Sequence, residues 1–409
     1  MACCSYRGDI AHPVAVRVLA QRVSRASLGE RTASSASAPL NARCSALSRP
    51  ALRGRPQVSC AAAAAPSGGV GVRTLTSWLL AQERVGLDRE LATLLDSVAS
   101  ACRRISSLVA RAPLDGMVGL AAASNASGDE QKKLDVIAND VFAGAVCDSG
   151  RCNILVSEEE EQPVLVSSTG SYIACFDPID GSSNIDAAVP TGSIFGIYSL
   201  GECIVDEDVD SAAEVLDKCL VNVRQSGNEL AAAGYCLFSS STVLVLTVKS
   251  GVFGFTLDRT RGEFILSHDA VRIPDPGQRI VSGNLGNLLR WSPPLRTYFQ
   301  SVLCAEPNPY SYRYIGALVG DFHRTLLYGG LWLYPPDATA PQGKARLLYE
   351  VAPMALLAEQ AGGMATWGEG AQLRVLDVVP KSTHERCPLF VGSASEVIRL
   401  QQYLAAARA

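Results

Sequence analysis

The most constraining feature of this chain is the stretch Phe176-Asp177-Pro178-Ile179-Asp180-Gly181-Ser182-Ser183-Asn184. The β-type run 172–176 comes directly before two carboxylates, so a strand is expected to end where these carboxylates begin. Carboxylates in such a position are typical ligands of a hard cation. The turn that follows offers backbone N–H groups and hydroxyls to an anion. A cation site beside an anion cradle indicates phosphate-ester chemistry with Mg2+ or Mn2+.

A second acidic group, Glu158 to Glu161, closes another apolar run at 153–156. Two strand ends could therefore direct their oxygens to one point. Each motif alone also has a simpler interpretation. Asp-Pro-x-Asp-Gly favours an ordinary chain reversal, and a run of four glutamates is typical of a solvated acidic turn. The metal hypothesis depends on the two motifs occurring together.

The first 60 residues differ in composition from the rest of the chain. They contain nine arginines, no lysine and only two acids, with many Ser and Ala. This composition predicts an organelle transit peptide over 1–60, followed by a flexible linker over 61–72. The remaining residues carry more negative charge than the −4 of the whole chain, which gives no reason to expect nucleic-acid binding.

Length and periodicity predict a mixed α/β protein with packed layers. With 409 residues and 48% hydrophobic content, the chain can bury a large core in more than one domain. The uncharged stretch 230–248 is interrupted by Gly234 and a Ser/Thr cluster, so two strands are expected there and no membrane span. Helical spacing occurs at 90–112, 131–146, 353–360 and 396–407, and strand-like runs occur at 243–248, 252–257 and 263–267.

The central motif continues through Ile185 to Tyr198, and further blocks occur at 128–135, 313–316, 320–326 and 347–350. With these blocks the chain resembles the fructose-1,6-bisphosphatases, in their chloroplast form, from about Thr74 to about Leu404. The resemblance implies a layered αβαβα sandwich of the sugar phosphatase superfamily. It also implies two domains, 73–271 and 272–409, with a metal site at their junction.

The resemblance implies two to three Mg2+ ions per subunit, with Mn2+ as a possible substitute. The implied ligands are the carboxylates of Glu158, Asp177, Asp180 and Glu350 and the carbonyl of Ile179. Glu159 and Asp135 match the pair that polarises the attacking water. Asp129 matches the start of a segment that closes over the metals.

Substrate contacts are implied in the same way. The matching residues are Asp180, Gly181, Ser182, Ser183, Asn284, Tyr314, Tyr334 and Lys344. Arg313 matches a residue that reaches into a neighbouring subunit, which implies a dimer or tetramer; the alternative is a surface salt bridge. His323 is interpreted as a structural histidine rather than an acid or base.

Regulation is implied by the segment 199–226, which matches an inserted segment of chloroplast members that thioredoxin reduces. Cys203 and Cys219 are the implied disulfide pair, and closing the fifteen residues between them would constrain the chain by about 3 kcal/mol. Arg224 stands where many members have a third cysteine. The alternative is two free surface thiols.

The resemblance therefore implies Mg2+-dependent hydrolysis of D-fructose 1,6-bisphosphate in the chloroplast stroma, serving the Calvin cycle and starch synthesis. Two alternatives stay open at this point. One is a sedoheptulose-1,7-bisphosphatase, although the continuation Asn184-Ile185-Asp186-Ala187 favours the fructose enzyme. The other is a catalytically silent member that acts as a binding subunit.

Overall fold

The computed structural model describes residues 72–124, 130–167, 169–201, 222–368 and 373–407. Val72–Ala409 forms one compact unit. The predicted transit peptide, most of the predicted linker, Asp129, Cys203 and Cys219 lie outside the described residues.

A sheet of eight strands forms the first β-layer, in the order β10-β9-β8-β7-β6-β5-β3-β4. Neighbouring strands are antiparallel except for β3 and β5, which are parallel. The strands are β3 (Cys152–Ser157), β4 (Val164–Leu165), β5 (Tyr172–Asp180), β6 (Thr191–Ser199), β7 (Leu230–Phe238), β8 (Thr242–Thr247), β9 (Val252–Asp258) and β10 (Glu263–Val271). A separate pair, β1 (Leu120–Ser124) and β2 (Glu130–Lys132), is antiparallel.

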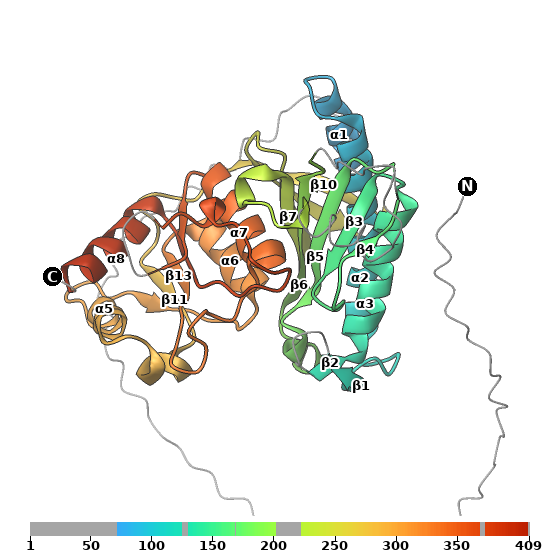
Figure 1. Ribbon diagram of the computed structural model, residues 1–409. Coiled ribbons are helices and arrows are strands. Elements are labelled where there is room, and N and C mark those ends of the chain that lie inside the picture. Colours follow the sequence, from blue (N-terminus) through green and yellow to red (C-terminus); the bar gives the residue numbers. More distant parts are fainter. Residues whose placement is uncertain (1–71, 125–129, 168, 202–221, 369–372, 408–409) are drawn as a thin grey trace, which may run out of the picture. The chain divides into compact units, whose positions relative to one another are not determined.

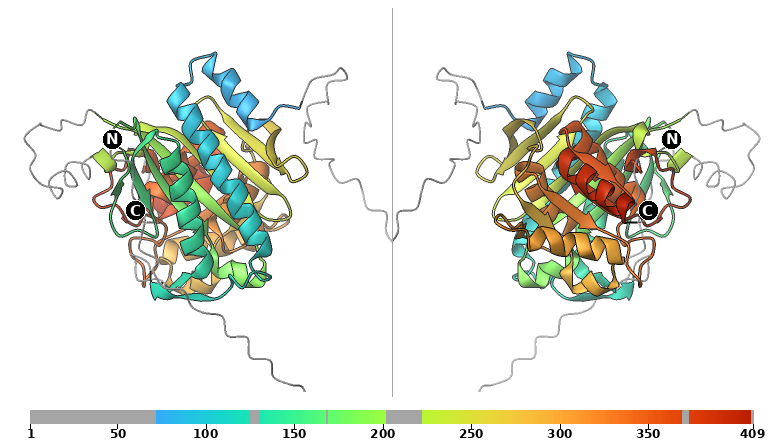
Figure 2. Two further views of the ribbon diagram at one scale, coloured as in Figure 1. Left: turned by 90° about the vertical axis from the view of Figure 1, so that its right-hand side faces the viewer. Right: turned by 90° about the vertical axis from the view of Figure 1, so that its left-hand side faces the viewer.

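Helices α1 (Leu75–Glu83), α2 (Arg89–Arg111) and α3 (Lys133–Asp148) cover one face of this sheet (Figures 1 and 2). Helix α2 begins where the Asp88 side chain accepts a hydrogen bond from the Leu91 N–H, a standard N-cap. Its buried side chains recur every three or four residues, so one stripe faces the sheet. Phe142 of α3 stacks on Phe176 of β5 at a centroid distance of 4.2 Å.

Helices α6 (Leu318–Tyr328) and α7 (Ala352–Gln360) pack against the other face of the eight-stranded sheet and also contact the second sheet. That sheet has the order β12-β11-β13-β15-β14. Its strands are β11 (Ile280–Ser282), β12 (Ser311–Tyr312), β13 (Leu331–Tyr334), β14 (Met364–Thr366) and β15 (Leu389–Gly392). Helices α5 (Pro293–Leu303) and α8 (Ala394–Ala406) form the last layer (Figure 1).

The layers therefore alternate as α/β/α/β/α, which confirms the predicted fold class. The helices and strands predicted from periodicity all occur, with ends shifted by a few residues. The uncharged stretch 230–248 forms β7 and β8, as predicted, and no helix among the described residues is long and apolar enough to cross a membrane. Short helical turns complete the fold: η1 (Ser182–Ala187), η2 (Gly227–Glu229), η3 (Leu285–Arg290), the π-helical η4 (Leu347–Val351) and η5 (Val375–Asp377).

One local prediction is wrong: β5 does not end at Phe176 but continues to Asp180. Asp177 pairs with Ile194 and Asp180 with Gly192, and the register shifts between these two pairs. Pro178 has no N–H to give to a ladder, so the strand accommodates it in this irregular stretch. The two carboxylates therefore stand on a buried strand, and the turn begins only at Gly181.

Candidate metal and phosphate site

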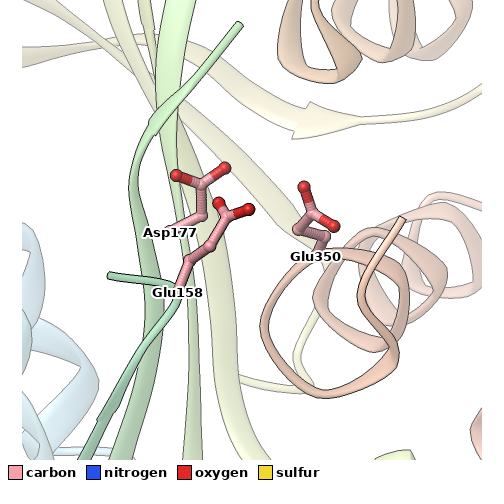
Figure 3. Close-up of side chains that lie close together, drawn as sticks. All are labelled: Glu158, Asp177 and Glu350. Carbon is pink, nitrogen blue, oxygen red and sulfur yellow. The ribbon is translucent and has the colours of Figure 1, made fainter. Parts of the chain in front are cut away.

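Three carboxylates form the centre of the site: two belong to the eight-stranded sheet or its edge, and one belongs to η4. Glu158 directly follows β3, and its N–H donates to the Phe176 carbonyl of the parallel neighbour β5 at 3.1 Å. Asp177 lies on β5, and Glu350 comes from η4. One oxygen from each residue lies within 4.8 Å of the others (Figure 3). A hard cation prefers such an all-oxygen donor set.

The electrostatics of this cluster favour a bound cation. Burial and the charges of Glu158 and Glu350 raise the pKa of Asp177 well above its ordinary value. Burial and the Glu159 charge raise the pKa of Glu158 to about 7. Asp177 Oδ1 accepts from the Ile179 N–H at 2.9 Å, while its buried Oδ2 has no hydrogen-bond partner among the described residues. A cation would satisfy that oxygen and offset the repulsion.

Asp180 and Gly181 connect the acidic cluster to α6. Asp180 Oδ2 accepts from the Val319 N–H at 2.7 Å, and burial raises the pKa of this carboxyl to about 6. Gly181 has φ +74°, and a Cβ there would stand 2.7 Å from the Ala317 Cβ, so only glycine fits. Ser182 then begins η1, so the small-residue turn lies beside the carboxylates.

Asp135 and Glu159 form a second acidic pair. Asp135 lies in the first turn of α3 and accepts from the Lys132 N–H at 2.7 Å. Burial raises its pKa to about 7, and the charge of Glu159 adds to this shift. The Glu159 N–H donates to Ser157 Oγ at 3.2 Å, which holds the acidic turn against β3. A carboxyl with a pKa near 7 can accept and release a proton near neutral pH.

A cavity of about 270 Å³ opens beside the carboxylates. Tyr314, Tyr334 and Lys344 line it together with Glu158, Asp180 and Glu350. Cationic and phenolic donors facing carboxylates suit a phosphate ester that is shared with a metal.

Among the lining residues that the motifs did not single out are Trp332, Arg346 and Arg386. The Arg346 charge opposes the rise in the Glu158 pKa, and the Arg346 N–H donates to the Glu350 carboxylate. No sequence pattern marks Arg346; its position directly before η4 brings its backbone N–H to the Glu350 carboxylate.

Five residues matched to substrate contacts are not among the described residues that line this cavity: Gly181, Ser182, Ser183, Asn284 and Arg313. Asn284 Oδ1 accepts from the Gly286 N–H at 3.0 Å and caps η3. Arg313 is exposed and donates to the Tyr312 carbonyl at 2.7 Å. His323 Nδ1 lies 2.7 Å from the Tyr235 hydroxyl, and burial lowers the pKa of His323 to about 4, in agreement with a structural histidine.

Comparison with known proteins decides the family. The family model "Fructose-1-6-bisphosphatase, N-terminal domain" matches residues 73–269, and the C-terminal domain model matches residues 273–405. The chain belongs to the fructose-1,6-bisphosphatase family. The Arabidopsis thaliana relative, named fructose-1,6-bisphosphatase 1, chloroplastic, is 51% identical over 351 residues, which cover 84% of this chain and 83% of that protein. The chloroplastic relative of Spinacia oleracea is 51% identical over 345 residues, 82% of each chain.

A solved structure supports the same assignment at the level of the fold. The Leishmania major fructose-1,6-bisphosphatase in its holo form superposes with a TM-score of 0.75 at 40% identity, covering 82% of this chain and 100% of that one. The resemblance stated from the motifs is thereby confirmed, and so are the enzyme class, fructose-bisphosphatase, and the chloroplast location.

Proposed function

We propose that this fructose-bisphosphatase removes the 1-phosphate of D-fructose 1,6-bisphosphate with two to three Mg2+ ions, or Mn2+ in their place. Glu158, Asp177, Asp180, Glu350 and the Ile179 carbonyl would hold the ions. The observation that carries this proposal is the group of three carboxylates within 4.8 Å, next to a cavity lined by Lys344 and two tyrosines. A catalytically silent member would have no need to keep this repulsive cluster buried.

Other residues of the site would bind the substrate, accept a proton and cover the site. Lys344, Tyr334 and Tyr314 would orient the sugar and its 6-phosphate, with Asn284 at the edge. The N–H groups and hydroxyls of Gly181, Ser182 and Ser183 would hold the 1-phosphate beside Asp180. Asp135 and Glu159 would accept a proton from the attacking water, and Asp129 would help to cover the site. When bound, Mg2+ supplies positive charge against the phosphoryl oxygens.

Phosphate release tests this function. We expect the purified protein to release phosphate from fructose 1,6-bisphosphate with at least about tenfold higher kcat/KM than from sedoheptulose 1,7-bisphosphate, a difference of about 1.4 kcal/mol. The activity should require Mg2+ and disappear with a chelator. A preference for the seven-carbon sugar would replace the substrate assignment, and no release from either sugar would overturn the proposal.

We further propose that the enzyme works in the chloroplast stroma, where it serves the Calvin cycle and starch synthesis. Thioredoxin would control its activity. Cys203 and Cys219 would form the regulatory disulfide. The chloroplastic relatives support this. Strand β6 (Thr191–Ser199) supports it too, because its Gly192 pairs with Asp180 and its last residue, Ser199, begins the predicted regulatory segment 199–226. A constraint applied after β6 could therefore act, through the pairing of β6 with β5, on the strand that carries Asp177 and Asp180.

The redox prediction concerns Cys203→Ser. We expect reduction by a dithiol to raise the activity of the wild type several-fold, because opening the disulfide releases β6, and to leave the variant unchanged. Phosphate release at fixed Mg2+, before and after dithiol treatment, measures this. Cys304→Ser, an exposed cysteine elsewhere, is the control and should respond like the wild type. Two alkylatable thiols at 203 and 219 in the oxidised protein would contradict the disulfide.

The assembly and the domain division also remain proposals. A homodimer or homotetramer in which Arg313 reaches a neighbouring active site is supported by the exposure of that side chain. A boundary near Arg272 is supported by the family models, which change between residues 269 and 273.

A further inference from the structure

A segment at residues 381–387 passes beside the chain that leads into η4. The Leu347 N–H donates to the Glu385 carbonyl at 2.8 Å, and the Cys387 N–H donates to the Ala345 carbonyl at 2.8 Å. These bonds hold His384 next to the turn that carries Glu350. No residue of this segment was singled out from the sequence.

The His384 ring contacts both sides of the acidic cluster. Its Nδ1 lies 2.8 Å from the Tyr349 hydroxyl, and its Nε2 lies 3.3 Å from the Glu161 carbonyl oxygen. A carbonyl only accepts, so Nε2 carries the proton. In a neutral imidazole, Nδ1 then accepts from the Tyr349 hydroxyl. The two bonds have different partners and fix both the tautomer and the orientation of the ring.

The two partners of His384 are each close in sequence to a carboxylate of the cluster. Tyr349 is fully buried and precedes Glu350 in η4. Glu161 ends the acidic turn that Glu158 begins, and the start of that turn is fixed to β5 through the Glu158 N–H. His384 and these two hydrogen bonds form a bridge from Tyr349 to Glu161. The bridge joins Glu350, on η4, to Glu158, beside the sheet, although the negative charges of these carboxylates repel each other.

We propose that His384 is a positioning residue that holds Glu158 and Glu350 at a metal-binding separation, acting through Tyr349 and the Glu161 carbonyl. This inference rests on the proposed metal-dependent function. Outer-shell hydrogen bonds of this kind orient metal ligands, and their loss typically weakens metal binding by about 10- to 100-fold.

Direct metal binding tests the inference without relying on activity. Mn2+ binding to the purified full chain is measured by electron paramagnetic resonance of the free ion. We expect His384→Asn to raise the Mn2+ Kd about tenfold, because Asn can replace Nδ1 but cannot reach the Glu161 carbonyl. Tyr349→Phe removes a single hydroxyl and leaves the ring in the core, so it tests the same bridge in a folded protein.

The double variant separates positioning from general destabilisation. If both residues act through one bridge, the effect of His384→Asn plus Tyr349→Phe on the Kd is smaller than the product of the two single effects. His323→Asn is the matched control, because it breaks another part-buried histidine–tyrosine bond, to Tyr235, and neither of these two residues lines the cavity beside the carboxylates. It should lower the melting temperature but leave the Mn2+ Kd unchanged.

Three outcomes are distinguishable. A Kd that rises in both bridge variants and not in His323→Asn supports the positioning role. Kd values in His384→Asn and Tyr349→Phe equal to that of the control overturn it while the proposed function stands. A wild type that does not bind Mn2+ overturns the proposed metal site and the positioning role together.

Discussion

Replacing Asp177 by Asn is expected to lower kcat at least about 10³-fold, which corresponds to about 4 kcal/mol of transition-state stabilisation. Asp177 is buried, and its Oδ2 has no partner among the described residues, so its negative charge is available to a cation. Asn has nearly the same shape but no charge. The loss should therefore appear in kcat and in Mg2+ affinity, measured by phosphate release across Mg2+ concentrations and by Mn2+ titration.

The matched control for Asp177→Asn is Glu161→Gln. It makes the same change of charge on the acidic turn, but Glu161 is exposed and its contact with His384 uses the backbone. Activity should stay within about twofold of the wild type, as for most surface substitutions. Retention of more than a tenth of the wild-type kcat in Asp177→Asn would contradict the metal-ligand role. Equal losses of activity in both variants would point to the net negative charge of this region instead of a ligand role for Asp177.

The meeting of Glu158 and Asp177 could be predicted from the sequence because it follows from local patterns. Each carboxylate follows or ends an apolar run, and both runs became neighbouring strands with the same direction. Helix α2 was predictable for a similar reason, since its apolar spacing is regular over more than five turns. Glu350 is different: it belongs to a distant part of the chain, and only the resemblance to a family indicated it.

The features that sequence reasoning missed depend on tertiary packing. The extension of β5 from Asp177 to Asp180 goes against the turn propensity of its residues, because the ladder to β6 outweighs that propensity. Arg346 carries no motif of its own and gains its role from the cavity that it lines. His384 reaches Glu161 across 223 positions of sequence, a contact that no local pattern encodes.

Mg2+ affinity is expected to fall about 10- to 100-fold when the pH is lowered from 8 to 6. A carboxylate must lose its proton before it can bind a metal ion. Burial raises the pKa of Glu158 to about 7 and that of Asp180 to about 6, so protons compete with Mg2+ in this interval. One competing group with a pKa of 7 weakens binding about tenfold between these pH values, and a second group adds to this. Isothermal titration at both pH values measures the change.

The same raised pKa values determine whether the free energy of unfolding of the metal-free protein rises or falls with pH. Between about pH 4 and 7 Glu158 and Asp180 bind more protons in the metal-free folded protein than in the unfolded chain, so their contribution to stability falls as the pH rises through this window. Mg2+ binds the folded state and offsets that loss where the carboxylates are ionised. The rise in melting temperature caused by Mg2+ should therefore be larger at pH 8 than at pH 6, whereas Asp177→Asn should show a small rise at both. A Mg2+-induced rise that is equal at the two pH values in the wild type would mean that these buried carboxyls are not the groups that hold the metal.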